Sequence, residues 1–272
     1  MKIFQAYYKE EQRTHLDSEF TPFDNTANPV VNFHEYYIYK RIYEQAVQDQ
    51  EDLWGHFSWQ WKRKLNDVPP QQILDIINVN PGADVYTFLP FPWECATAWN
   101  VWEQGQWCHP HILTLAEEIL TRMNIDPVVL QTPMGSRDYL CVNYFVGNKQ
   151  FWDRLLAFLD LFVETTEKLD QPYLELLNQS ANYGDNLSLN YRGFICERMI
   201  STFFVLNKDL IVRPFIEIYK GRLGEDLIKL VALKDKAVDQ KDKQLLYTYL
   251  DTRSQGINGH NWGQDWIETC VL

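Results

Sequence analysis

Residues 2–215 of this chain alternate between strand-like and helix-like segments, and this alternation restricts the fold more than any other feature. Segments with amphipathic helical periodicity, such as residues 33–48 and 148–169, lie between the strands. Such alternation is typical of an α/β sheet, mostly parallel, with helices on both faces. We therefore predict one α/β domain over residues 1–215 and a helical, loop-containing C-terminal extension over 216–272 packed on it. The strand-like runs are residues 2–8, 52–59, 83–91, 139–147 and 210–215.

Charge and composition exclude several classes of protein. The formal net charge is −12, which argues against nucleic acid as a partner because phosphate neutralisation needs a basic surface. A single nucleotide needs only a local pocket and stays a candidate ligand. The chain shows no apolar run of about 18 residues, which predicts no transmembrane segment. Residues 227–243 are lysine-rich and amphipathic, but aspartates interrupt the basic face, so a solvated helix is favoured and peripheral membrane contact is left open.

The cysteines and the N-terminal residues indicate the compartment. Five cysteines are dispersed without Cys-x-x-Cys spacing, and "MKIFQAYYKEEQ" has no apolar core of a signal peptide. Both features predict reduced thiols and a cytoplasmic location.

Several catalytic motifs are absent from the sequence. It contains no P-loop, no Gly-x-Gly-x-x-Gly and no Gly-x-Ser-x-Gly. "WCHPH" (107–111) places Cys108, His109 and His111 together, but no second ligand cluster accompanies them, so we predict a helix cap or an active-site loop. The chain also lacks the Asp-x-Asp pair that often holds the divalent cation in sugar transfer. We predict no metal ligands and no certain cofactor, with Mg²⁺ or Mn²⁺ kept as candidates.

The predicted helix "YRGFICERMISTFFVL" (191–206) is apolar around most of its surface, yet it carries three charges near its start. Glu197 and Ser201 share one face, and Arg198 and Thr202 share the next. An unpaired buried charge costs several kcal/mol, so these charges must be paired or face a cavity. Two interpretations follow: a buried ion pair that links the helix to the sheet, or the wall of a binding site.

The segments "CVNYFVGNKQFWDRLLAFLDLFVETTE" and "YRGFICERMISTFFV" resemble DUF4422-type bacterial glycosyltransferases and related capsule and lipopolysaccharide sugar transferases. The matching positions are an Asn-x-Phe strand at 143–145, a Lys-x-Phe helix start at 149–151 and the arginine, Gly-Phe and Glu-Arg positions of the 191–206 helix. Gly55 also matches, whereas Ser58 and Trp59 replace a His-Tyr pair of that family. The resemblance implies a GT-A-like, Rossmann-type nucleotide-sugar fold.

The resemblance also implies roles for individual residues. Glu197 would be a base or a sugar-hydroxyl anchor, and Arg192 and Arg198 would neutralise the leaving diphosphate. The remaining predicted contacts are Tyr7 and Tyr8 around the base, Asp24 and Asn25 on base or ribose, Trp59 and Lys62 near the diphosphate or sugar, Asp84 on ribose or donor sugar, and Asn143 on the acceptor side.

These observations lead to one predicted function and two alternatives. The predicted function is a glycosyltransferase that moves a sugar from a nucleotide-sugar donor to a saccharide or glycolipid acceptor in bacterial surface polysaccharide synthesis. One alternative is a non-catalytic carbohydrate-binding protein on a degenerate transferase fold. The other is a hydrolase or nucleotide-processing enzyme of the α/β class.

Overall fold

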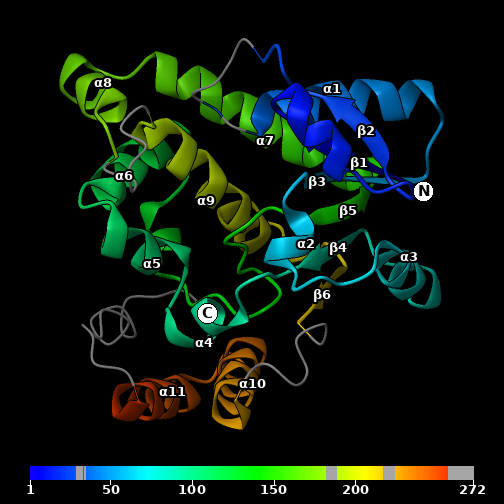
Figure 1. Ribbon diagram of the computed structural model, residues 1–272. Helices are drawn as coiled ribbons and strands as arrows, with labels where there is room; N and C mark the ends of the chain where they lie inside the picture. The colour runs from blue at the N-terminus through cyan, green and yellow to red at the C-terminus, as the bar shows by residue number, and fades with distance from the viewer. Residues whose placement is uncertain (29–32, 34, 182–188, 217–223, 257–272) are drawn as a thin grey trace.

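The computed structural model describes residues 1–28, 33, 35–181, 189–216 and 224–256. Its centre is a six-stranded mixed sheet with the strand order β2-β1-β3-β5-β4-β6 (Figure 1). The strands are β1 (Lys2–Tyr7), β2 (Thr21–Asp24), β3 (Leu53–Ser58), β4 (Val85–Phe88), β5 (Phe145–Asn148) and β6 (Val212–Phe215).

The direction of the strands defines one edge of the sheet as the place for a ligand. Strands β1, β2 and β3 are mutually parallel, β4 is parallel to β6, and β5 runs antiparallel to both β3 and β4. The prediction of a mostly parallel sheet is therefore confirmed. The carboxyl ends of five strands meet at one edge, where ligands of open α/β sheets bind. Strand β5 ends at the opposite edge, because it is reversed.

Helices cover both faces of the sheet, as predicted. Alternate residues of a strand point to opposite faces. Phe4 and Trp54 pack in the larger core with the helices between β2 and β3 and after β5, whereas Ile3 and Phe57 pack in a second core with the two helices that follow β3. The helices are α1 (Tyr36–Gln48), α2 (Trp61–Lys64), α3 (Pro70–Val79), α4 (Pro92–Thr97), α5 (Val101–Cys108), α6 (Ile112–Arg122), α7 (Lys149–Glu167), α8 (Gln171–Asn178), α9 (Tyr191–Leu206), α10 (Glu225–Asp239) and α11 (Lys243–Gly256).

Helix α9 is buried around most of its circumference. It begins at the cap Asn190, whose side chain accepts a hydrogen bond from the amide of Arg192. It packs against α5, α6, α7 and α8, which explains why its apolar residues are not confined to one face. Its charged residues must therefore find partners inside the molecule or reach a cavity.

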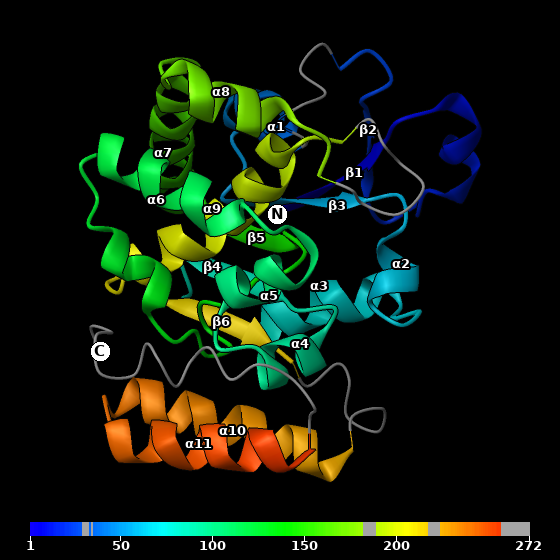
Figure 2. The ribbon, with the colours of Figure 1, turned by 90° about the vertical axis from the view of Figure 1, so that its left-hand side faces the viewer.

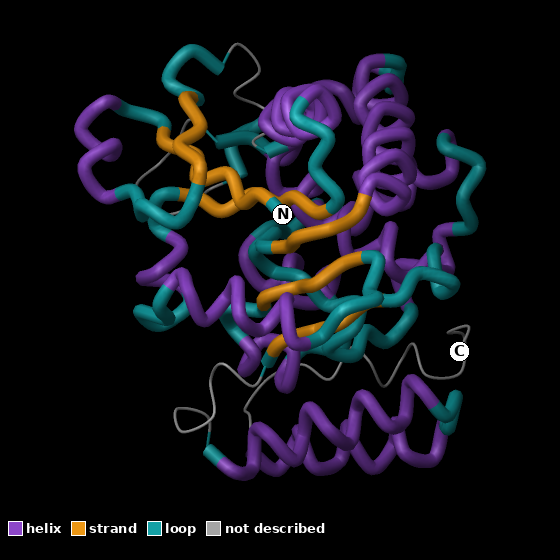
Figure 3. Tube along the Cα trace, turned by 90° about the vertical axis from the view of Figure 1, so that its right-hand side faces the viewer, coloured by secondary structure: helices purple, strands orange, loops and turns teal. Residues whose placement is uncertain are grey.

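The C-terminal helices α10 and α11 form an antiparallel pair that lies against α4 (Figure 2). Leu230 and Tyr249 from this pair share a small apolar core with Ala96 and Trp99 from the α4 region. Figure 3 shows the pair as a separate layer beyond the β6 side of the sheet. Within the described residues, none of the helices is long and apolar enough to cross a bilayer.

Candidate functional site

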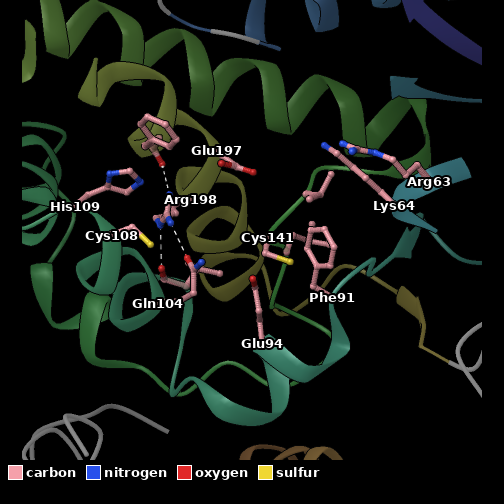
Figure 4. A pocket seen from close by; sticks show the side chains of 14 residues that line it. Arg63, Lys64, Phe91, Glu94, Gln104, Cys108, His109, Cys141, Glu197 and Arg198 are labelled. Atoms are coloured by element: carbon pink, nitrogen blue, oxygen red, sulfur yellow. Dashed lines mark hydrogen bonds between the residues drawn. The ribbon is translucent and has the colours of Figure 1, made fainter. Parts of the chain in front are cut away.

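A cavity of about 450 Å³ lies where loops leave the carboxyl ends of β3 and β4 and meet α5 and α9 (Figure 4). This is the edge of the sheet at which the strand directions predict a ligand. Its walls mix cations, carboxylates, thiols and aromatic rings. The lining residues are Arg63, Lys64, Phe91, Glu94, Val101, Gln104, Cys108, His109, Leu140, Cys141, Val142, Phe194, Glu197 and Arg198.

Two cationic side chains reach the cavity from the segment that follows β3. Arg63 and Lys64 belong to the short helix α2, which begins three residues after β3 ends. Arg63 is exposed and bonds only to the neighbouring Gln60 through Nη2, at 2.9 Å, among the described residues. Lys64 lies over the ring of Tyr144, with Nζ 5.7 Å from the ring centroid, and forms no ion pair within the described chain. Both cations are therefore available to an anionic ligand.

Arg198 lines the opposite side and is held in place by three hydrogen bonds. Its Nε donates to the carbonyl of Val101 at 3.0 Å, Nη1 to the carbonyl of Phe194 at 3.0 Å and Nη2 to Oε1 of Gln104 at 2.6 Å. Gly105 permits this approach, because a Cβ at that position would lie 2.5 Å from Nε of Arg198. The guanidinium is thus fixed on α5 without a carboxylate partner among the described residues.

Glu197 points into the cavity between these two cationic sides (Figure 4). Over the described parts of the chain its carboxylate has neither a hydrogen-bond donor nor an ion-pair partner. Burial raises the pKa of Glu197 to about 7; Glu35 and Glu94 act in the same direction, and Arg198 and Lys64 oppose them. Neither Glu197 nor Arg198 therefore forms the ion pair between α9 and the sheet that was one of the two interpretations. Both side chains lie in the wall of the cavity.

The other titratable groups of the cavity are also perturbed by burial. Burial raises the pKa of Glu94, which lies opposite Glu197 on α4. It raises the pKa of the Cys141 thiol well above its usual value, and the negative charges of Glu94 and Glu197 add to this. Burial and the charge of Arg198 lower the pKa of His109, whose Nδ1 lies 3.0 Å from the carbonyl of Ala181. At neutral pH the thiol and the imidazole are uncharged, so neither is an activated nucleophile or a cation.

A second polar cluster adjoins the cavity on the β1 side. Glu35, just before α1, accepts hydrogen bonds from the hydroxyl of Tyr39 at 2.7 Å and from Nδ2 of Asn143 at 3.1 Å. Oδ1 of Asn143 and both ring nitrogens of His56 are buried without a hydrogen-bond partner in the described part of the structure. Buried polar atoms without partners are rare in folded proteins and mark places where water or a ligand supplies the missing bond.

The structure separates the three charged residues predicted on α9. Glu197 and Arg198 line the cavity, whereas Arg192 does not. Nε of Arg192 donates to Oδ1 of Asn178 at 3.0 Å, and its guanidinium lies over the ring of Phe33. Arg192 therefore connects α9 with α8 and lies away from the cavity that the resemblance assigned to it.

Four other predicted residues lie at the ends of β1 and β2. Tyr7 pairs with Asp24 across the two strands, and Tyr8 follows β1 with 38% of its surface exposed. Asp24 accepts hydrogen bonds from the amide and hydroxyl of Thr26, which lower its pKa. Asn25 is buried, and neither atom of its amide has a partner in the described residues. This group lies at the ligand edge but does not line the cavity.

The remaining predicted residues have other partners. Lys62 forms an ion pair with Asp17, which is also bonded by the indole of Trp61. The ring of Trp59 lies 5.9 Å from that of His15 between centroids, in a tilted arrangement. Asp84 precedes β4 and so lies at the opposite edge of the sheet, where it accepts from Nδ2 of Asn148 and from a backbone amide, each at 2.8 Å. The structure thus gives Lys62 and Asp84 packing roles away from the cavity.

Sequence reasoning missed several residues of the cavity. Arg63, Lys64 and Glu94 were not predicted, although the "KRK" run directly after a predicted strand was a usable signal. Cys108 and His109 line the cavity, and the "WCHPH" segment caps two helices, with His109 after α5 and His111 before α6, as the helix-cap interpretation predicts. Glu35 carried no local signal, because only the fold brings it next to Asn143. No cluster of three His, Cys, Asp or Glu side chains suited to a metal ion occurs in the described part of the chain.

Comparisons with known proteins add no relative. No protein-family model matches the chain, and neither a curated protein nor a solved structure matches it at a significant level.

Proposed function

We propose that this chain is a glycosyltransferase with a GT-A-like fold, which moves a sugar from a nucleotide-sugar donor to a saccharide or glycolipid acceptor. The observation that supports this most strongly is the position of Glu197, whose carboxylate has no partner among the described residues and faces a cavity with cations on both sides, where burial raises its pKa to about 7. A general base with a pKa near the working pH is the most effective at accepting a proton. Two cations near such a base match the charge of a leaving diphosphate.

In this proposal the nucleotide lies along the carboxyl edge of the sheet. Its base and ribose occupy the region of Tyr8 and Asn25, where the unpartnered amide offers both a donor and an acceptor. Its diphosphate reaches Arg63 and Lys64, which take over the role that the resemblance gave to Lys62 and Arg192. Tyr144 connects the two regions, because it contacts Ser58 after β3 and lies under Nζ of Lys64.

The reaction is a single displacement at the anomeric carbon. An acceptor hydroxyl attacks this carbon and forms the new glycosidic C–O bond, while the bond to the diphosphate oxygen breaks and its electron pair leaves with the nucleoside diphosphate. Glu197 accepts the hydroxyl proton, and the positive charges of Arg63 and Lys64 stabilise the leaving group. Arg198 holds the wall beside Glu197 and lowers the pKa of that carboxylate against the effect of burial.

Thermal stability measured with a panel of nucleotide sugars, with and without Mg²⁺ or Mn²⁺, tests this proposal. A ligand at 100 times its Kd adds roughly 2.7 kcal/mol to the stability of the folded state. We expect one nucleotide class to raise the Tm of the wild type. Lys64→Met should weaken that donor at least tenfold, since it removes a cation that contacts the diphosphate.

Lys168→Met is a matched control, because Lys168 is an exposed lysine whose ion pair lies on the surface of α7. This variant should bind the donor as the wild type does. Absence of any shift across the panel would contradict the proposal and favour the carbohydrate-binding alternative. A shift that depends entirely on Mg²⁺ or Mn²⁺ would assign the neutralisation of the diphosphate to a metal ion as well as to Arg63 and Lys64.

A further inference from the structure

The segment Phe91-Pro92-Trp93-Glu94 combines two aromatic rings and a carboxylate at the mouth of the cavity. It follows β4 and begins α4. The rings of Phe91 and Trp93 lie 5.0 Å apart between centroids. Phe91 and Glu94 line the cavity, while Trp93 has 43% of its surface exposed beside it. The segment therefore extends from the interior of the cavity to the protein surface.

These side chains have the chemistry that a neutral sugar ring requires. A pyranose has an apolar face of C–H groups, which packs on an aromatic ring, and hydroxyl groups around its rim, which donate to carboxylates. Trp and Tyr combine a large apolar surface with a polar handle and often occur at binding surfaces for this reason. The ring of Phe91 is tilted by 56° against the indole of Trp93, and Glu94 adds a carboxylate from the next residue of the same segment.

The surroundings of Trp93 favour a saccharide over a membrane. Exposed indoles also insert into lipid headgroups, but stable attachment to an anionic leaflet needs basic residues near the insertion point. The protein has a net charge of −12, and the nearest charged group on this segment is the carboxylate of Glu94. An uncharged polyhydroxy ligand suits this combination better than an anionic lipid surface.

We propose that Phe91, Trp93 and Glu94 form a binding subsite for one neutral sugar ring of the acceptor, stacked on Trp93 with hydroxyl groups donated to Glu94. The acceptor role of this sugar rests on the proposed transferase function. Binding of the sugar itself does not, so the two proposals fail in different experiments. The subsite places the acceptor at the open end of the cavity, with its nucleophilic hydroxyl directed inward to Glu197.

Binding of saccharides can be measured from the indole N–H signals of the ¹⁵N-labelled full chain. The probes are oligosaccharides of glucose, galactose, mannose, rhamnose and N-acetylglucosamine, added at up to 20 millimolar, on the order of the weak affinities expected for single stacked sugars. We expect at least one probe to shift the Trp93 signal. Trp93→Ala should weaken this probe at least fivefold, Trp93→Phe should retain part of the affinity, and Glu94→Gln should weaken it severalfold.

Trp107→Ala is the control, because Trp107, with 49% of its surface exposed against 43% for Trp93, lies on α5 outside the Phe91–Glu94 segment. It should bind the probe as the wild type does. A panel that leaves the Trp93 signal unmoved would overturn the subsite. Trp93-dependent binding to phosphatidylglycerol vesicles without saccharide binding would overturn it in favour of a membrane contact. Saccharide binding without any nucleotide-sugar binding would keep the subsite and remove the transferase proposal.

Discussion

Two groups of charged side chains in this protein differ in how they are partnered. Where α11 meets α5, Arg253 and Glu103 form two hydrogen bonds of 2.7 and 3.0 Å, and their side chains are 5% and 0% exposed. Lys234 on α10 is buried and donates to two backbone carbonyls of the α4 region. In the cavity on the other side of α4 and α5, Glu197 has no such partner within the described residues.

The difference shows which buried charges belong to the fold. A protein keeps a buried ion only if its bonds are satisfied by the chain or by what fills a cavity. The C-terminal pair satisfies its ions through bonds to α5 and to the backbone of the α4 region. Glu197 receives no such bonds from the described residues, and burial therefore raises its pKa.

The largest expected effect is the loss of folding stability when the buried ion pair of Arg253 and Glu103 is broken. Arg253→Met leaves the carboxylate of Glu103 buried without its cation, which should cost about 3–5 kcal/mol of folding free energy. Urea unfolding measures this loss. Lys229→Met is the control, because its ion pairs with Glu225 and Asp226 are exposed, and it should cost less than about 1 kcal/mol. Equal losses in the two variants would contradict the distinction between the two kinds of charge.

The next largest effect is the dependence of folding stability on pH that His56 causes. Burial lowers the pKa of this histidine to about 4, whereas in the unfolded chain it keeps its ordinary value near 6.5. Between these values the unfolded state binds the proton and the folded state does not, so stability falls as the pH is lowered through this window. The contribution is on the order of 2–3 kcal/mol. His56→Asn should remove this part of the pH dependence, which urea unfolding at pH 7 and pH 4.5 measures; an unchanged slope would show that His56 is not kept neutral.

Ionisation of Glu197 should change folding stability with pH in the direction opposite to that of His56, and by a slightly smaller amount. Its raised pKa means that the folded state holds the proton up to about pH 7, while the unfolded state releases it above pH 4.5. Stability from this group is present at low pH and is lost as the pH rises through the window. Relative to the wild type, Glu197→Gln should therefore gain about 2 kcal/mol between pH 5 and pH 8. A difference in Tm that is the same at both pH values would mean that the carboxylate has a partner.

The smallest effect concerns the attachment of Arg198 to α5. A methyl group at Gly105 would displace this guanidinium from its three acceptors, and the gain in helix propensity offsets part of the loss. We expect Gly105→Ala to cost about 1 kcal/mol and to lower the donor-induced rise in Tm. Gln106→Ala, one residue along α5, is the comparison for the substitution itself. A Gly105→Ala protein that binds donor as the wild type does would show that the position of Arg198 is unimportant.

The sequence predicted the features that depend on local pattern. Alternating apolar segments gave the α/β class and most of the sheet, and the charges on an apolar helix pointed to Glu197 and Arg198. The short strand β2 was missed because its four residues carry only a weak signal. Helices α5 and α8 were missed because each has eight residues, about two turns.

The parts that could not be predicted depend on strand direction and tertiary contacts. Nothing in the residues of β5 shows that it runs antiparallel, and this reversal places its carboxyl end at the far edge of the sheet. Asp84 lies at that same edge because it comes before its strand rather than after it. Glu35 and Glu94 approach Glu197 only when α1, α4 and α9 are assembled, so their effect on its pKa is a property of the fold.

Release of nucleoside diphosphate by the wild type and by Glu197→Gln tests the central claim most directly. The assay uses the nucleotide sugar that raises the Tm most, together with the saccharide that shifts the Trp93 signal. We expect turnover by the wild type and at least a hundredfold slower release by Glu197→Gln, because a general base contributes about 10²–10⁴ in rate. The donor-induced rise in Tm should persist in the variant. Equal rates from both proteins would contradict the role of Glu197 as the base and return the cavity to a purely binding function.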